Sequence, residues 1–368
     1  MTVAALPPVL VVTPDFPPAD GGIQLTAQRV TSLLRGLAPT VVTLSQPAAS
    51  AYDERQPFAI HRSRPLAVRP ATVLGLNAEA VAIGLRGRTA AVLSMHIVGS
   101  PAGAVLSRRL GIPFVQYLHG HELGVRPRLA RLAVRAADRV VAVSSYTAER
   151  AEAIGADRDR IAIVHPGVDL PSLRPPQDRR GPPTVVTIAR LEERYKGHDV
   201  ILRALPLVRS KVPDVRWRVI GDGALRPMLQ ERCRTMGLGG TVRFLGPVSD
   251  AERDAELERA DVFCMVSRMS AGSVAGEGFG IVYLEAGAHS LPVVAGAVGG
   301  ATDAVVHDQT GLLVDPEDHL AVAEALVTLL TDRDRARRLG DGGRARAEAC
   351  SWQSTADQVG DLLLGLMS

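Results

Sequence analysis

The sequence predicts an α/β protein built of two doubly wound domains, each with a parallel sheet between helices. Its 368 residues exceed one ordinary core and fit two domains of about 100–200 residues each. Short apolar runs bounded by turn residues alternate with longer amphipathic stretches, as in buried parallel strands joined by crossover helices. Hydrophobic residues make up 46% and charged residues 22%, which excludes a disordered or collagen-like chain.

The elements of each half follow from this alternation. Apolar runs predict strands at 9–12, 40–44, 90–95, 114–117, 139–143 and 161–164 in the first half, and at 184–188, 217–220, 242–245, 262–265 and 292–295 in the second. Helical spacing of apolar residues predicts helices at 23–36, 128–137, 225–236, 320–331 and 352–367.

A proline-rich stretch separates the two series. Prolines stand at positions 171, 175, 176, 182 and 183, where neither a helix nor a central strand can form. We therefore expect a first domain over 1–170, a linker over 171–183, a second domain over 184–350, and a terminal helix over 351–368 that packs back toward the first domain. Doubly wound domains bind ligands at the carboxyl ends of their strands, so we expect the chemistry in strand-to-helix loops facing an interdomain cleft.

The charge is distributed unevenly along the chain. The net charge is +3, but residues 1–180 carry +8 (21 basic, 13 acidic) and residues 181–368 carry −5 (21 basic, 26 acidic). Arg128, Arg131, Arg135 and Arg139 are spaced to form a stripe along one helical face. The stripe is either a solvated face in an arginine-rich protein or a contact with an anionic membrane or acceptor.

The cysteines and the lengths of the apolar runs indicate the cellular compartment. The three cysteines form no C-x-x-C pair, which indicates neither a disulfide framework nor a zinc site and favours a reducing cytoplasm. Pro7 and Pro8 interrupt the first apolar run, which makes it a poor signal peptide, and no stretch approaches about 20 apolar residues. We expect a cytoplasmic protein, at most peripheral at the inner face of the membrane.

Two loops of the first half carry candidate binding groups. Gly21 and Gly22 open a helix after the first strand, where bare backbone N–H groups could meet a phosphate or simply form a tight turn. His119, His121 and Glu122 follow the strand at 114–117. They lack the spacing of a helical zinc motif and no cysteine or aspartate cluster completes them, so a polar ligand is favoured over a metal.

In the second half, Arg190 and Lys196 bracket the loop after the first strand. Two cations at that end of a sheet suit a diphosphate, although a solvated basic loop is the alternative. Gly221 and Gly223 begin a dinucleotide fingerprint, but Arg226 replaces its third glycine, which makes a nicotinamide enzyme a minor hypothesis.

The segment 275–286 carries two carboxylates and three glycines. Gly278 and Gly280 leave backbone N–H groups accessible at a helix start, with Glu277 just before it and Glu285 two turns later. Eight positions at about 100° each return to nearly the same face, so we expect both carboxylates to point the same way, toward a sugar and a ribose. Capping of the helix by Glu277 is the alternative, and it leaves Glu285 unexplained.

Together these motifs resemble the retaining GT-B glycosyltransferases of family four. The resemblance covers essentially the whole chain and implies two Rossmann-like domains with an active site in the cleft between them. The phrases DFPPADGGIQ, HGHELG and GEGFGIVYLEA are similar to those of actinobacterial phosphatidylinositol mannoside mannosyltransferases. The family's loop between the two cations has one residue fewer, so Tyr195 or a neighbour is an insertion here.

The resemblance implies a role for each site residue. His119 and Glu277 would be the catalytic residues at the transferred sugar, and Glu285 would hold the nucleotide ribose. The other donor-binding residues would be Gly22, Arg190, Lys196, Val248, Phe279, Gly280 and Ile281, with Val248 and the loop after Met265 facing the base. The family needs no metal or other cofactor, and the leaving phosphate helps to deprotonate the acceptor, so no enzymic nucleophile is implied.

The predicted function is therefore transfer of a hexose, with mannose from GDP-mannose as the leading example, to a hydroxyl acceptor. The acceptor would be a phosphatidylinositol mannoside-type lipid, another glycoconjugate or a natural-product core, and no nucleic-acid partner is expected. A sugar-nucleotide epimerase of the same fold and a non-catalytic nucleotide-sugar binding module are the alternatives.

Overall fold

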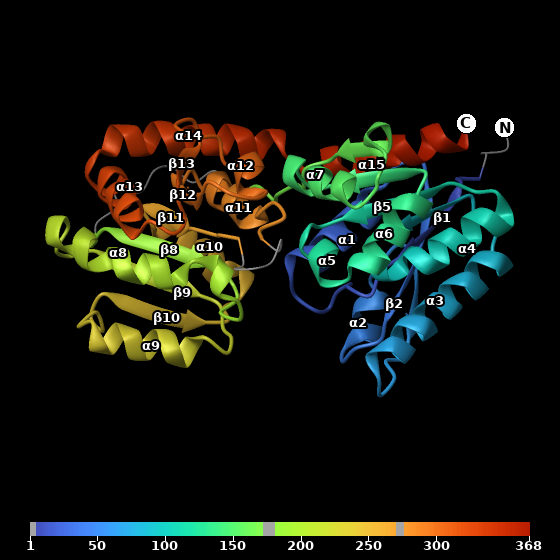
Figure 1. The fold of residues 1–368 in the computed structure, drawn as a ribbon, viewed down its shortest axis with the longest axis horizontal. Coiled ribbons are helices and arrows are strands. Elements are labelled where there is room, and N and C mark those ends of the chain that lie inside the picture. Colours follow the sequence, from blue (N-terminus) through green and yellow to red (C-terminus); the bar gives the residue numbers. More distant parts are fainter. Residues whose placement is uncertain (1–4, 172–180, 270–275) are drawn as a thin grey trace. The chain divides into compact units, whose positions relative to one another are not determined.

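The computed structural model describes residues 5–171, 181–269 and 276–368. The chain divides into two compact units. The first unit comprises Met1–Gly167 and Trp352–Ser368, and the second comprises Val168–Ser351. Within each unit the strands lie side by side between helices (Figure 1), which confirms the predicted fold class of two parallel-sheet α/β domains.

In the first unit the described residues form a seven-stranded parallel sheet in the order β3-β2-β1-β4-β5-β6-β7. Its strands are β1 (Pro8–Val12), β2 (Ala38–Leu44), β3 (Ala59–Ser63), β4 (Ala91–Ser94), β5 (Phe114–Leu118), β6 (Arg139–Ala142) and β7 (Ile161–Ile163). The strand order reverses between β1 and β4, so the loops after these strands diverge and leave room for a ligand.

The helices of the first unit are α1 (Gly22–Leu33), α2 (Ala49–Asp53), α3 (Arg69–Arg86), α4 (Ser100–Leu110), α5 (His121–Val125), α6 (Pro127–Ala136), α7 (Ser145–Ala153) and α15 (Trp352–Met367). The terminal helix α15 packs against α1. Gln353 Nε2 donates to the Leu33 carbonyl at 3.2 Å, and Thr355 Oγ1 donates to the His165 carbonyl at 2.9 Å. The last 17 residues thus belong to the same unit as the first 167.

In the second unit the described residues form a six-stranded parallel sheet in the order β10-β9-β8-β11-β12-β13. Its strands are β8 (Thr184–Ile188), β9 (Arg216–Ile220), β10 (Val242–Gly246), β11 (Val262–Met265), β12 (Val293–Gly296) and β13 (Gly311–Val314). Its helices are α8 (His198–Lys211), α9 (Arg226–Thr235), α10 (Asp250–Arg259), α11 (Ile281–Ala288), α12 (Ala301–Ala304), α13 (His319–Thr331) and α14 (Arg333–Ala349).

Each sheet forms the centre of its own apolar core. Val92, Phe114 and Val140 of the first sheet pack with helix residues such as Leu76 and Leu106. In the second unit the strands contribute residues such as Val185, Trp217 and Val262, which are inaccessible to water. The continuous apolar runs reflect burial on both faces of a parallel sheet, which is why these strands could be predicted.

Two edge strands were missed by the sequence prediction. β3 has the sequence Ala-Ile-His-Arg-Ser, and β13 begins with a glycine, so neither has the continuous apolar run of a central strand. Each lies at the end of its sheet, where one side needs no partner strand. Hydrogen bonding to β2 and to β12 decides these two elements rather than their own composition.

The predicted arginine stripe is shorter than expected. Helix α6 ends at Ala136, and Arg139 is the first residue of β6. Only Arg128, Arg131 and Arg135 therefore lie on one helical face, and all three are exposed. The stripe was predicted too long because the helical spacing of the arginines continues past the end of the helix into the strand at 139.

Candidate active site

In the second unit, a lysine and a glutamate from two distant loops form a close ion pair. Lys196 follows β8, and its Nζ donates a hydrogen bond of 2.6 Å to Oε2 of Glu277, which precedes α11. The hydroxyl of Ser267, after β11, donates to the same oxygen at 3.3 Å. Each of the two charged side chains is 13% exposed. The pair thus gathers a cation and an anion at the carboxyl ends of neighbouring strands.

The ammonium group of Lys196 is held in its charged form. Burial lowers its pKa, but the Glu277 carboxylate and the Tyr195 phenol oppose burial, and the pKa lies above the ordinary value for lysine. A buried cation paired in this way remains available to neutralise a second anionic group, such as a phosphate.

The loop between Arg190 and Lys196 packs inside the protein at Tyr195. Tyr195 lies in a single 3₁₀ turn over Arg194–Lys196, and its side chain is buried. Its ring centroid is 5.0 Å from Lys196 Nζ. Gly197 has φ +78°, and a Cβ there would lie 2.2 Å from the Val266 carbonyl oxygen. This local packing holds Lys196 within reach of Glu277.

A second glycine pair fixes the backbone around Glu277. The N–H of Gly300 donates to the Glu277 carbonyl at 2.8 Å. A Cβ on Gly300 would lie 1.9 Å from the carbonyl oxygen of Gly278, and Gly299 has φ +62°. This close approach of two backbones needs residues without side chains. The sequence prediction did not include Gly299 and Gly300, although a Gly-Gly pair after a strand was a usable signal.

The helical periodicity used to place the two glutamates on one face does not apply. Helix α11 begins at Ile281, with Gly280 as its N-cap at φ +90°, so Glu277 lies in the loop before the helix. Only Glu285 is helical, and the 100° periodicity does not relate it to Glu277. No described side chain caps α11. Phe279 and Gly280 are buried at this helix start.

Glu285 has a different environment from Glu277. Burial raises the pKa of its carboxyl group above the usual range, although the nearby Arg253 guanidinium opposes that shift. Arg253 Nη1 lies 3.8 Å from Glu285 Oε1, and the glutamate side chain is 18% exposed. Such a carboxylate, only loosely paired, can still accept hydrogen bonds from ligand hydroxyl groups.

Arg190 is exposed but stands on a tightly fixed loop. Its Nη2 contacts Glu193 Oε1 at 3.3 Å, and the side chain is 71% exposed. The Leu191 N–H donates to the Asp222 carbonyl at 2.8 Å. A Cβ on Gly221 would lie 2.1 Å from the Ala189 carbonyl oxygen. The glycines at 221 and 223 thus allow two loops to pack closely. This packing accounts for their presence without a bound dinucleotide.

The residues predicted near the base are only partly described. Val248 is half-buried between β10 and the Ser249 cap of α10. The loop after Met265 is described as far as residue 269, and residues 270–275 lie outside the described ranges.

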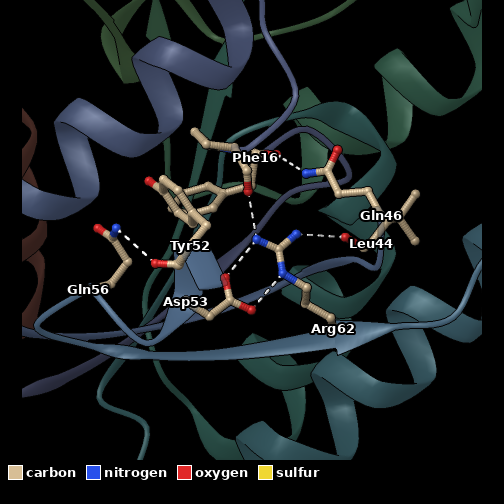
Figure 2. A network of polar contacts seen from close by, with 8 residues as sticks. Phe16, Leu44, Gln46, Tyr52, Asp53, Gln56 and Arg62 are labelled. Carbon is tan, nitrogen blue, oxygen red and sulfur yellow. Dashed lines mark hydrogen bonds and ion pairs between the residues drawn. The ribbon is translucent and has the colours of Figure 1, made fainter. Parts of the chain in front are cut away.

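In the first unit, Gly22 begins α1 next to an anchored loop. Gly21 is the N-cap with φ +151°, and both glycines are exposed. Arg62 of β3 pairs through two hydrogen bonds of 2.8 Å with Asp53 and donates to the Pro17 carbonyl at 2.6 Å. Figure 2 shows this guanidinium between Asp53 and the Leu44 carbonyl. The edge strand β3 therefore holds the loop that leads to Gly22.

His119 lies at the carboxyl end of β5, where it is half-buried. Its Nε2 is 2.7 Å from the Met95 carbonyl oxygen, and its backbone N–H donates to Glu122 Oε1 at 2.6 Å. Gly120, with φ +103°, lets the chain turn into α5. Glu122 is thus turned inward, 5% exposed, and holds the loop that carries His119.

No cluster of three or more metal-ligating side chains occurs within 5–171, 181–269 and 276–368. Nor does any helix in these ranges combine the length and the apolar character that crossing a bilayer requires.

Comparison with known proteins identifies the chain. Residues 21–171 match the model of Glycosyltransferase Family 4, and residues 172–346 match that of Glycosyl transferases group 1. The chain is 34% identical to the GDP-mannose-dependent alpha-(1-6)-phosphatidylinositol monomannoside mannosyltransferase of Mycobacterium tuberculosis, over 97% of this chain and 98% of that protein. It belongs to glycosyltransferase family 4. This membership confirms the predicted family and the prediction of a glycosyltransferase.

Other family 4 relatives extend the comparison. The enzyme of Mycolicibacterium smegmatis with the same name is 35% identical over 97% of this chain and 98% of its own length. Among solved structures, sucrose-phosphate synthase from Thermosynechococcus elongatus superposes with a TM-score of 0.84 at 23% identity, covering 98% of this chain and 99% of that one. Anabaena HepE with UDP and glucose gives 0.79 at 20% identity over 98% and 100%. These structures confirm the GT-B fold of this family 4 glycosyltransferase.

Proposed function

We propose that this glycosyltransferase transfers mannose from GDP-mannose to a hydroxyl group of a phosphatidylinositol mannoside-type lipid, with retention of the anomeric configuration. The ion pair of Lys196 with Glu277 is the observation that carries the proposal, because it brings a phosphate-binding cation within 2.6 Å of a carboxylate able to bind sugar hydroxyls. The names of the mycobacterial relatives supply the sugar, the nucleotide and the acceptor class.

The donor would occupy the loops of the second unit. Lys196 and Arg190 would bind the diphosphate, together with the backbone of Phe279, Gly280 and Ile281 at the start of α11. When the diphosphate binds, the Lys196 ammonium group exchanges part of its hydrogen bonding to Glu277 for hydrogen bonds to phosphate oxygens. The carboxylate can then accept hydrogen bonds from the mannose hydroxyls.

The remaining predicted site residues would also take part in donor binding. Glu285 would accept hydrogen bonds from the ribose hydroxyls, and Val248 would contact the base. Gly22 would offer its backbone N–H to the donor phosphate, and His119 would lie at the sugar near the reacting carbon.

The proposed reaction needs no nucleophile from the enzyme. The acceptor oxygen attacks the anomeric carbon on the face that the phosphate leaves. A carbon–oxygen bond to the acceptor forms as the bond to the phosphate breaks, the acceptor proton passes to the leaving phosphate oxygen, and GDP is released. Lys196 stabilises the charge that develops on that phosphate. Glu277 binds the sugar and does not attack it.

This function would bring the protein to the cytoplasmic face of an anionic membrane. The exposed Arg128, Arg131 and Arg135 of α6 suit such a contact, since each basic residue near an anionic surface contributes about 1 kcal/mol.

Transfer can be tested with the purified chain, GDP-mannose and phosphatidylinositol monomannoside. We expect acceptor-dependent release of GDP, a product whose new linkage has the anomeric configuration of the donor by NMR, and the same rate with EDTA. A thermal-shift screen of nucleotide diphosphate sugars should give its largest shift with GDP-mannose.

Three results would contradict the proposal. An epimerised nucleotide sugar formed without any acceptor would indicate an epimerase. Donor binding without turnover across lipid, glycoconjugate and natural-product acceptors would indicate a binding module. Turnover only with acceptors that carry no lipid would exclude phosphatidylinositol mannoside-type lipids as the acceptor.

A further inference from the structure

The first unit contains a cavity that the donor-binding residues do not explain. It has a volume of about 470 Å³, a size typical of ligand sites. Most of its wall is apolar and comes from β2, from the start of α3 and from the segments that follow β4 and β5. The apolar lining residues include Leu44, Leu66, Val73, Leu76, Val98 and Val125.

Two of these apolar residues are exposed to water to an unusual extent. Leu66 is 53% exposed and Val125 is 60% exposed. Neighbouring Val68 and Leu74 are 60% and 71% exposed. Exposed apolar side chains at the wall of a cavity are unfavourable in water and suit an apolar ligand. The occupant that removes them from water must itself be apolar.

The same cavity is lined by two arginines as well as by the carboxylates of Asp15 and Glu122. Arg69 and Arg126 both contribute to its wall, and neither guanidinium has an ion-pair partner in the part of the chain that the structure describes. A guanidinium presents paired N–H donors that match phosphate oxygens. The occupant therefore combines an apolar chain with an anionic group.

The cavity also reaches the loop of His119. Glu122 lines it while its Oε1 accepts from the His119 backbone N–H at 2.6 Å. Its second oxygen, Oε2, is buried and has no hydrogen-bond partner among the described residues. Because this oxygen is closed to a water-sized group, it is also out of reach of a ligand in the cavity, and Glu122 acts by positioning the His119 loop.

We propose that this cavity binds one acyl chain of the lipid acceptor, with the lipid phosphate at Arg69 and Arg126. The inference rests on the proposed function, since it names the part of the acceptor that the first unit recognises. An acyl chain removes Leu66 and Val125 from water, and the phosphate pairs the two free guanidinium groups.

The test compares two acceptors in the complete enzyme, namely diacylated phosphatidylinositol monomannoside and its deacylated, water-soluble counterpart. For the wild-type protein we expect kcat/KM to favour the acylated acceptor. Leu66→Asp should reduce that preference by about tenfold or more, because a carboxylate in the cavity opposes both the chain and the phosphate. Leu85→Asp is the matched control, since Leu85 is 51% exposed on α3 but does not line the cavity.

The expected result is a loss of preference in Leu66→Asp and none in Leu85→Asp. An unchanged preference in Leu66→Asp would overturn the proposal. Equal losses in both variants would overturn it too, because they would indicate a general contact with a lipid surface.

A binding measurement separates this inference from the proposed function. Equilibrium dialysis with labelled lysophosphatidylinositol, below its micelle concentration, should give saturable binding to wild-type protein that Leu66→Asp weakens by about tenfold. Binding of this kind without any mannose transfer would contradict the proposed function and support the cavity assignment. Mannose transfer to the lipid without such binding would support the proposed function and contradict the cavity assignment.

Discussion

The loop site of the second unit and the cavity of the first unit differ in how their polar groups are satisfied. In the second unit, Lys196 and Glu277 neutralise each other while both side chains are largely buried. In the first unit, Arg69 and Arg126 line an apolar cavity without ion-pair partners among the described residues, and Glu122 keeps a carboxylate oxygen without a donor.

The cost of burial explains the difference. An unpaired charge inside a protein costs several kcal/mol, so the lysine and the glutamate need each other. The exposed Arg69 retains its hydration and needs no partner. A site made of buried charges is therefore held in place by its own ion pair, whereas a hydrated arginine at an open cavity stays available to pair with an incoming anion. The following predictions test this contrast, beginning with the largest expected effect.

Glu277→Gln should reduce kcat/KM for mannose transfer by about ten- to a hundredfold, because it removes a charged hydrogen-bond acceptor from the sugar and leaves Lys196 without its counter-ion. Steady-state kinetics with GDP-mannose measure the effect. Glu324→Gln on the exposed face of α13 is the control and should behave as wild type. Wild-type turnover in Glu277→Gln would show that the ion pair is not needed for mannose transfer.

Gly300→Ala should destabilise the second unit by about 1–3 kcal/mol, because the new methyl group would lie 1.9 Å from the Gly278 carbonyl oxygen and force two backbones apart. Denaturant unfolding measures the change. In Gly239→Ala the added methyl group meets no atom within 4 Å, so this variant should lie close to wild type. Equal stability of the two variants would mean that the backbone at Glu277 is not tightly fixed.

Glu285→Gln should raise KM for the donor by about tenfold while kcat changes less, since the residue is assigned to the ribose and not to the reacting sugar. The pH dependence gives a second measurement. Because burial raises the pKa of Glu285, the wild-type carboxylate is lost at a higher pH than in an ordinary glutamate. Donor KM should therefore rise as the pH falls through that pKa, and this rise should be missing in Glu285→Gln. A KM that follows pH identically in both proteins would exclude the ribose assignment.

The smallest effect is expected at the surface arginines. Arg131→Gln should weaken binding to anionic vesicles by about 1 kcal/mol and leave stability within about 0.5 kcal/mol. Flotation with anionic and neutral vesicles measures the binding, with Arg333→Gln in the second unit as the control. Equal recovery of wild-type protein from both kinds of vesicle would mean that α6 is only a solvated helix face.

Much of the fold could be predicted because parallel strands buried on both faces are continuous apolar runs. β5 and β8 were predicted in this way, and α15 was predicted over its whole length from helical spacing. The edge strands β3 and β13 were not, since pairing with one neighbour does not require an apolar sequence.

The residue types of the site were determined by the sequence alone. Two cations after β8 and a glycine-rich segment with two glutamates before and within α11 indicate diphosphate and sugar chemistry wherever the loops lie. Only the tertiary structure decided which groups meet. Lys196 and Glu277 are 81 positions apart and touch because β8 and β11 are neighbours in a parallel sheet, whose carboxyl ends bring their loops together. The same holds for the cavity of the first unit, whose wall comes from segments that no periodicity in the sequence connects.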